Sequence, residues 1–157
     1  MVRVLLISIL SLACPRLGAF PLIGSCQSSS QTAIGDYRML DVLLVDDETH
    51  FLKSLAEGLR VYSGKIHVMT AENGKKAVEI LKTTVVNVVV TDLRMPCMDG
   101  YEFLRYMQEN HPRVPVIIMS ACSQASVEPQ LTGLRFARYI EKPSDLDEIA
   151  QSILTVA

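Results

Sequence analysis

The sequence contains no tryptophan, only four cysteines and no large excess of charge of either sign. The cysteines are Cys14, Cys26, Cys97 and Cys122; because no two of them form a CxxC pair, a zinc ribbon and a dense disulfide framework are disfavoured. The 15 basic and 17 acidic residues give a net charge of -2, so no strong basic field is available to hold nucleic acid. The chain does have 49% hydrophobic residues in a length of 157, enough for the core of a single domain.

Residues 1–38 differ in composition from the rest of the chain. Arg3 precedes the apolar run Val4–Ala13, a pattern typical of a secretory signal, and the run is shorter than the roughly 20 residues of a membrane span. The alternative is that translation starts at Met39, directly before the first predicted strand, so that residues 1–38 are never made. We expect a poorly ordered extension over residues 1–38 and a globular domain over residues 39–157.

The rest of the chain alternates between short apolar runs and segments with helical spacing of apolar residues. Such runs, rich in β-branched residues, predict strands that are buried on both faces. The predicted strands are Val42–Val45, Ile66–Thr70, Val85–Val90, Val114–Met119 and Tyr139–Glu141. The predicted helices are Thr49–Val61, a segment around Ala77 and Leu81, Tyr101–Glu109, a segment around Pro129, and a last helix capped by Ser144. This alternation predicts an α/β domain with a doubly wound, five-stranded parallel sheet covered by five helices.

Polar residues follow four of the five predicted strands. Asp46 and Asp47 follow the first strand, Asp92 the third, Ser120 the fourth and Lys142 the fifth. Because ligands of such sheets bind outside the carboxyl ends of the strands, these side chains are expected to meet at one edge. Three carboxylates at one rim repel one another unless a hard cation such as Mg²⁺ binds, and a carboxylate can act as a nucleophile toward phosphorus. A lysine and a hydroxyl would then hold the phosphoryl oxygens, so the pattern predicts phosphoryl transfer.

Four motifs occur in order at these positions. They are LLVDDE at Leu43–Glu48, TDLRMPCMDG at Thr91–Gly100, MSA at Met119–Ala121 and YIEKP at Tyr139–Pro143. With them, the chain resembles the receiver domain of two-component response regulators over residues 39–157. The resemblance implies a flavodoxin-like receiver fold and a signalling switch controlled by phosphorylation.

The resemblance assigns the acidic residues. Asp92 corresponds to the phosphoacceptor aspartate. Asp46 and Asp47 correspond to the acidic pair that holds Mg²⁺, with Asp47 the more direct ligand; Asp92 and the backbone carbonyl of Arg94 would complete the metal site. The structural alternative for Asp46 or Asp47 is that it only caps the first helix.

The resemblance also assigns the residues after the fourth strand. Ser120 corresponds to the switch hydroxyl that moves onto the phosphoryl group, Lys142 to the lysine that pairs with that group, and Pro143 to a residue whose preceding peptide is often cis. Tyr139 corresponds to the aromatic residue whose rotamer changes on activation. The alternatives are that Ser120 only turns the chain, that Lys142 is a solvated surface lysine and that Tyr139 only fills the core. We interpret Asp99–Gly100 as turn residues only.

The segment expected to form the fourth helix departs from the family's pattern at Pro129. A proline inside a helix removes a hydrogen bond and kinks or ends the helix at a cost of ~3 kcal/mol. Alternatively, Pro129 opens a helix that starts late. The following segment, Gly133–Arg138, is bulkier than the small-residue turn usual in the family. Partner recognition by the usual output face, formed by the fourth helix, fifth strand and fifth helix, is therefore left open.

The function implied by the resemblance is that of a switch. Asp92 would accept a phosphoryl group from a sensor histidine kinase or a histidine phosphotransfer protein, with Mg²⁺, and so change binding to a downstream protein. Such a domain takes part in its own phosphoryl transfer and dephosphorylation without being an enzyme in the ordinary sense. Because the kinase and its ATP are cytosolic, we expect a cytoplasmic protein, or a membrane-tethered one if residues 1–38 are retained. The end at Ala157, directly after the last predicted helix, favours a stand-alone receiver similar to chemotaxis regulators, with a fragment as the alternative.

Two other functions remain as alternatives. A Mg²⁺-dependent phosphohydrolase with an aspartyl nucleophile usually carries DxD at the first strand end, where this chain has Asp46, Asp47 and Glu48. An interaction module that is never phosphorylated needs none of the site residues, all of which are present. Direct binding of nucleic acid is not expected.

Overall fold

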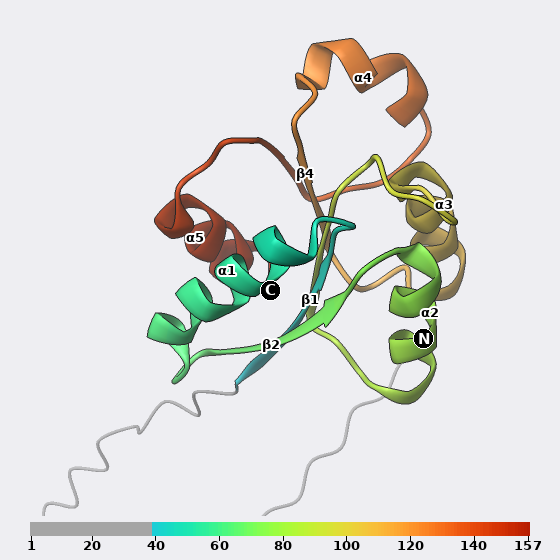
Figure 1. Ribbon diagram of the computed structural model, residues 1–157. Helices are drawn as coiled ribbons and strands as arrows, with labels where there is room; N and C mark the ends of the chain where they lie inside the picture. The colour runs from blue at the N-terminus through green and yellow to red at the C-terminus, as the bar shows by residue number, and fades with distance from the viewer. Residues whose placement is uncertain (1–38) are drawn as a thin grey trace, which may run out of the picture. The chain divides into compact units, whose positions relative to one another are not determined.

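The computed structural model describes residues 39–157, which fold around a five-stranded sheet. Figure 1 shows this sheet at the centre of the domain. The strands are β1 (Leu40–Val45), β2 (Ile66–Ala71), β3 (Val88–Thr91), β4 (Val116–Ser120) and β5 (Arg138–Glu141). Their order is β2-β1-β3-β4-β5, and each neighbouring pair is parallel. This topology confirms the predicted doubly wound α/β fold.

Helices cover both faces of the sheet. They are α1 (Thr49–Leu59), the 3-10 helix η1 (Arg60–Tyr62), α2 (Gly74–Thr83), α3 (Gly100–Asn110), α4 (Gln124–Leu131) and α5 (Leu146–Val156). Helices α1 and α5 pack on one face, and α2 and α3 pack on the other (Figure 1). Along β1, Leu43 and Val45 join the core under α2 and α3, whereas Val42 and Leu44 join the core under α1 and α5. Successive side chains of a strand point to opposite faces, so one strand contributes to both cores.

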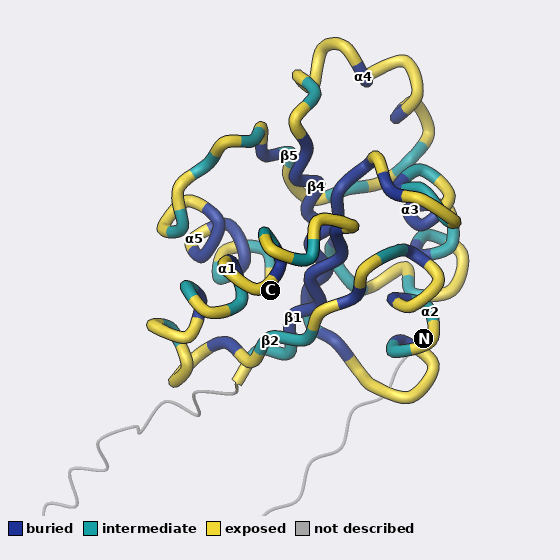
Figure 2. The backbone as a smooth tube through the Cα atoms, in the orientation of Figure 1, coloured by how far each residue is buried: buried dark blue, intermediate teal, exposed yellow. Residues whose placement is uncertain are grey.

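The middle of the sheet is buried along its length. Every residue of β3 and β4 is buried, whereas the edge strands β2 and β5 include exposed residues (Figure 2). Continuous apolar runs are what strands covered by helices on both faces require. The runs VVVT and VIIMS therefore mark the strands that hold the centre of the domain.

The third strand is shorter than the sequence predicted. It begins at Val88, not at Val85, which is 85% exposed. Asn87 marks the start of pairing with β1, because its N–H donates to the carbonyl of Asp41 at 2.7 Å and its Oδ1 accepts from the N–H of Asp41 at 2.9 Å. The apolar side chains before Asn87 made this connection resemble a strand.

Other element boundaries also differ from the prediction by one or two residues, and two of these differences have a local cause. Asp145, not Ser144, caps α5, because its Oδ1 accepts a hydrogen bond from the N–H of Glu148 at 2.7 Å. The hydroxyl of Ser144 instead donates to the carboxylate of Glu148 at 2.7 Å. Strand β4 begins at Val116, later than predicted, since Pro115 has no N–H to contribute to the ladder.

Pro129 lies inside α4, so the interpretation that it opens a late-starting helix is wrong. Its missing N–H removes the hydrogen bond that this position would donate to the carbonyl of Ala125. The helix ends two residues later at Leu131, and Gly133 then adopts a positive φ of 82°. Only Val127 and Leu131 of α4 are buried, one residue per turn. Helix α4 is short, and only these two side chains pack it against the core.

The signal-like pattern, the translation start and the two N-terminal cysteines concern residues 1–38, which lie outside the described residues. Within residues 39–157, no helix combines the length and the apolar character needed to cross a bilayer. Cys97 and Cys122 are both free thiols.

Candidate functional site

Backbone hydrogen bonds that continue past the strands position the predicted site residues. The N–H of Asp46 donates to the last residue of β2 at 3.1 Å. The N–H of Asp92 donates to the last residue of β1 at 2.9 Å, and that of Lys142 to the last residue of β4 at 2.8 Å. Each residue therefore sits one position beyond a strand but is still held by the neighbouring strand. The predicted strand-end edge exists, and these three residues share it.

The ammonium group of Lys142 joins the two buried carboxylates at this edge. Its Nζ lies 2.5 Å from Oδ2 of Asp46 and 2.9 Å from Oδ2 of Asp92. Asp46 is 1% exposed, Asp92 is 9% exposed, and the side chain of Lys142 is 17% exposed. Because removing one partner of a buried ion pair leaves an uncompensated charge, the three groups depend on one another.

The second oxygen of each carboxylate is held by backbone amides. Oδ1 of Asp46 accepts from the N–H of Glu48 at 2.9 Å. Oδ1 of Asp92 accepts from the N–H of Leu93 at 2.5 Å and from that of Arg94 at 3.3 Å. With one oxygen bound to the backbone and the other to Lys142, neither carboxylate is free to rotate. Asp46 thus bonds the residue at the N-cap of α1, Glu48, whereas no side chain caps the helix itself.

The charge state of Lys142 follows from two opposing effects. Burial acts to lower the pKa of Lys142, but the hydrogen bonds and negative charges of Asp46 and Asp92 outweigh burial, so the pKa lies above its usual value. The lysine is therefore a permanent cation at neutral pH. A fixed positive charge beside a carboxylate is suited to neutralising a phosphoryl group.

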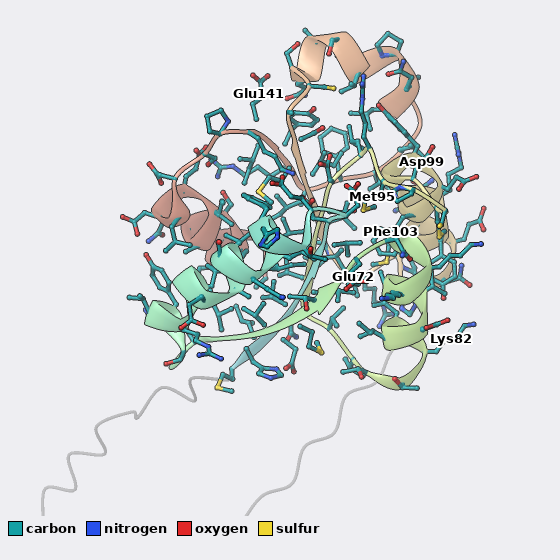
Figure 3. All side chains as sticks on the ribbon, viewed as in Figure 1. Glu72, Lys82, Met95, Asp99, Phe103 and Glu141 are labelled. Carbon is teal, nitrogen blue, oxygen red and sulfur yellow. The ribbon has the colours of Figure 1, made fainter. Side chains whose placement is uncertain are left out.

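Gly100 provides a close backbone approach beneath Asp92. A Cβ at Gly100 would lie 2.2 Å from the carbonyl oxygen of Asp92 and 2.5 Å from Cα of Leu93. Asp99 caps α3 by accepting from the N–H of Glu102 at 2.8 Å, and it begins that helix in Figure 3. The interpretation of Asp99–Gly100 as turn residues only is therefore wrong: Asp99 starts a helix, and Gly100 lets that helix pack against the loop that carries Asp92.

The remaining predicted residues lie around β4 and β5. Ser120 is 1% exposed at the end of β4. Tyr139 is half-buried, and its hydroxyl donates to the carbonyl of Cys122 at 2.7 Å. Burial raises the pKa of Tyr139, and the neighbouring Ser120 hydroxyl opposes this effect. The peptide between Lys142 and Pro143 is cis, as the resemblance implied.

Three further side chains, two beside the site and one that bonds the loop after α4, carried no sequence signal of their own. The ring centroid of Phe51 lies 4.6 Å from Nζ of Lys142. Glu141 accepts from the N–H of Gln124, the first residue of α4, at 3.0 Å, and its side chain lies beside α4 in Figure 3. The amide of Gln108 accepts from the N–H of Arg135 at 3.0 Å. The separation of 27 residues in that pair and of 17 residues in the Glu141 pair explains why no local pattern predicts them.

The oxygen donors at the edge fit a hard divalent cation. Asp46 and Asp92 are close enough to share one ammonium group, and the side chain of Asp47 is exposed next to Asp46. Among residues 39–157, no three side chains of His, Cys, Asp or Glu are gathered in a ready-made metal cluster. Mg²⁺ needs no such cluster, because it uses one or two carboxylates, retains several waters and takes further oxygens from a phosphate.

Sequence comparisons agree with this geometry. The family described as "Response regulator receiver domain" matches residues 42–154. The transcriptional regulatory protein GlrR of Escherichia coli K12 is 37% identical over 112 residues, which cover 71% of this chain and 25% of GlrR. The DNA-binding transcriptional regulator NtrC of Klebsiella pneumoniae is 32% identical over 105 residues, 67% of this chain and 22% of NtrC. The match thus spans about a quarter of the length of these curated relatives.

Solved structures show the same fold. The chemotaxis response regulator CheY4 of Vibrio cholerae has a TM-score of 0.69 at 20% identity, and the alignment covers 76% of this chain and 99% of CheY4. The receiver domain of the Francisella response regulator 1452 has a TM-score of 0.67 at 26% identity, with 74% and 95% covered. The family match, the strand order and the strand-end residues lead to one conclusion: the chain belongs to the response regulator receiver domain family and carries a receiver domain of two-component signalling.

Proposed function

We propose that Asp92 accepts a phosphoryl group from a phosphohistidine of a sensor histidine kinase or a histidine phosphotransfer protein. The observation that carries this proposal is the ammonium of Lys142 held between the carboxylates of Asp46 and Asp92 at the strand-end edge. A buried cation beside an oriented carboxylate is the arrangement that phosphoryl transfer to that carboxylate requires.

In the proposed step, an oxygen of Asp92 attacks the phosphorus atom. A P–O bond forms as the P–N bond to the partner's imidazole breaks, and the imidazole nitrogen keeps the electron pair and is then protonated. The amides of Leu93 and Arg94 fix the rotation of the Asp92 carboxylate before the attack. Lys142 contributes positive charge to the phosphoryl oxygens and transfers no proton.

The proposed ligands of Mg²⁺ are the side chains of Asp46, Asp47 and Asp92 together with the backbone carbonyl of Arg94. When bound, Mg²⁺ supplies further neutralisation of the phosphoryl oxygens. Asp47 has the only one of these carboxylates that is exposed.

The proposed output is a change of partner binding. With a phosphoryl group on Asp92, the hydroxyl of Ser120 turns toward it, and Tyr139 gives up its hydrogen bond to Cys122. This shifts a pre-existing equilibrium of the face formed by α4, β5 and α5 toward the form that a downstream protein binds. Because the kinase partner and its ATP are cytosolic, the proposal places the receiver in the cytoplasm.

Intact-mass spectrometry with Mg²⁺ and acetyl phosphate tests the proposal. We expect one phosphoryl adduct on the unmodified chain and on the control Asp147→Asn, whose altered carboxylate lies on α5. We expect no adduct on Asp92→Asn or after chelation of Mg²⁺. A full adduct on Asp92→Asn contradicts the proposal. A folded chain without any adduct favours the interaction module, and multiple turnovers on small phosphate esters favour the phosphohydrolase.

A further inference from the structure

Phe51 is the aromatic neighbour of the site lysine. It is the third residue of α1, it is partly buried, and its ring centroid lies 4.6 Å from Nζ of Lys142. Both side chains line a cavity of about 370 Å³ together with Pro143 and Ser144. An ammonium group within about 6 Å of a ring centroid is attracted to the negative face of the ring.

The ring is a further close neighbour of the ammonium group. A lysine ammonium has three N–H donors, and two of the neighbours that Lys142 meets are the carboxylates of Asp46 and Asp92. Phe51 is the third neighbour. The side chain of Lys142 is 17% exposed.

Asp46 links the position of the ring to that of the lysine. Its Oδ2 binds Nζ of Lys142, and its Oδ1 accepts from the N–H of Glu48. Glu48 is the N-cap of α1, and its carbonyl accepts the hydrogen bond of Leu52 at 2.9 Å. The carboxylate that holds the lysine thus also holds the first turn of the helix that carries Phe51.

We propose that Phe51 is a positioning residue for phosphoryl transfer to Asp92, and that it acts by holding the ammonium of Lys142 through a cation–π contact. This inference rests on the proposed function. When Asp92 becomes an acyl phosphate, the carboxylate that Lys142 contacts there loses its full negative charge. The contact with the ring is unaffected, because Phe51 belongs neither to Asp92 nor to the phosphoryl group. Phe51 therefore keeps the lysine in place while its electrostatic partner changes.

The test is a series of fluorinated phenylalanines introduced at position 51 alone. Fluorine withdraws electron density from the ring face while changing the shape of the ring little. We expect the rate of labelling by acetyl phosphate to fall stepwise from one to three fluorines, by about threefold to tenfold in total. We also expect Lys142 to react faster with an amine-acylating reagent, relative to the exposed Lys75 and Lys82, when each lysine is followed by peptide mass spectrometry.

The same series at Phe103 is the matched control, because Phe103 is fully buried in the core under α2 and α3. We expect neither readout to change there, and thermal unfolding verifies that every variant is folded. A labelling rate that is flat across the Phe51 series overturns the inference, since a ring that only fills space is insensitive to its charge distribution. If acetyl phosphate does not label the unmodified chain at all, the proposed function fails. The acylation rate of Lys142 across the Phe51 series then decides by itself whether the ring holds the lysine, and an unchanged rate refutes the contact.

Discussion

The carboxylate of Glu141, the last residue of β5, accepts a hydrogen bond from the N–H of Gln124, the first residue of α4, at 3.0 Å. The residue at the N-cap of α4, Ser123, makes no capping bond with its own side chain. A distant strand therefore supplies the cap that the local sequence does not. Glu141 directly precedes Lys142, so the beginning of α4 is attached next to the proposed phosphorylation site.

Loss of this cap is expected to loosen α4. We expect Glu141→Ala to cost about 1 kcal/mol of local stability, the usual value of an N-cap, because one of the unpaired N–H groups of α4 loses its acceptor. Amide hydrogen exchange in α4 should accelerate accordingly. Glu141→Gln keeps a carbonyl oxygen as acceptor and should retain most of the protection. Equal exchange rates in α4 for the two variants would contradict this assignment.

Substitution of Gly100 is expected to disturb the loop that carries Asp92. Gly100→Ala places a methyl group 2.2 Å from a backbone oxygen, and backbone gives way less easily than a side chain. We expect a loss of about 3 kcal/mol of unfolding free energy, together with slower labelling of Asp92. The matched control is Gly64→Ala, because an added Cβ at Gly64 meets nothing within 4 Å. Urea denaturation compares the two, and equal midpoints would show that the close approach at Gly100 carries no cost.

Cys97 is expected to be a site of stored backbone strain. Its φ of 72° lies in the left-handed region, which costs a residue with a side chain about 1 kcal/mol. Cys97→Gly should therefore raise the free energy of unfolding by up to about 1 kcal/mol. Cys97→Ala removes the thiol but keeps a Cβ, so it should leave the urea midpoint nearly unchanged. A gain shared by both variants would assign the effect to the thiol and not to the backbone.

Tyr62 and Asp147 give the surface a pH-dependent contact. The hydroxyl of Tyr62 donates to Oδ1 of Asp147 at 2.6 Å, and this hydrogen bond is the main reason that the pKa of Tyr62 lies above its usual value. Because the folded-state pKa is raised, the stability from this contact is complete below the unfolded-state pKa of about 10 and is lost as the pH rises through the higher folded-state value.

The expected consequence is a lower pKa for Tyr62 in Asp147→Ala, followed by NMR of tyrosine labelled with ¹³C at Cζ. The signal of Tyr62 is assigned by its disappearance in Tyr62→Phe. An unchanged pKa in Asp147→Ala would show that the hydrogen bond is not formed in solution.

The residues that the sequence predicted best are those whose position follows from chain order alone. Asp46 and Asp92 each come directly after a strand with a buried end, and Lys142 comes directly after β5. Parallel strands bring their carboxyl ends to one edge whatever the details of packing. That is why a pattern of single residues predicted three groups that the structure places within hydrogen-bonding distance.

The residues that the sequence did not predict depend on contacts between distant segments. In the sequence, Phe51 is one apolar residue of an amphipathic helix among others. Its contact with the ammonium group of Lys142 arises only when the chain folds. Val85 has the β-branched side chain of a strand residue, yet it is exposed, because pairing with β1 starts only at Asn87. The predicted N-cap of α5 was one residue too early because Ser144 and Asp145 are both suited to cap a helix, and only the backbone geometry selects between them.

Gln108 fixes the far end of α4 from a neighbouring helix. Its Nε2 donates to the carbonyl of Gly133 at 3.4 Å, and its Oε1 accepts from the N–H of Arg135 at 3.0 Å. The amide group of Gln108 thus donates one hydrogen bond to the loop after α4 and accepts one from it, as a backbone peptide group does in a sheet. Glu141 bonds the first residue of α4, so side chains from other elements hold both the beginning of the helix and the loop that follows it. The position of α4 is therefore set by residues of β5 and α3 as well as by its own two buried side chains.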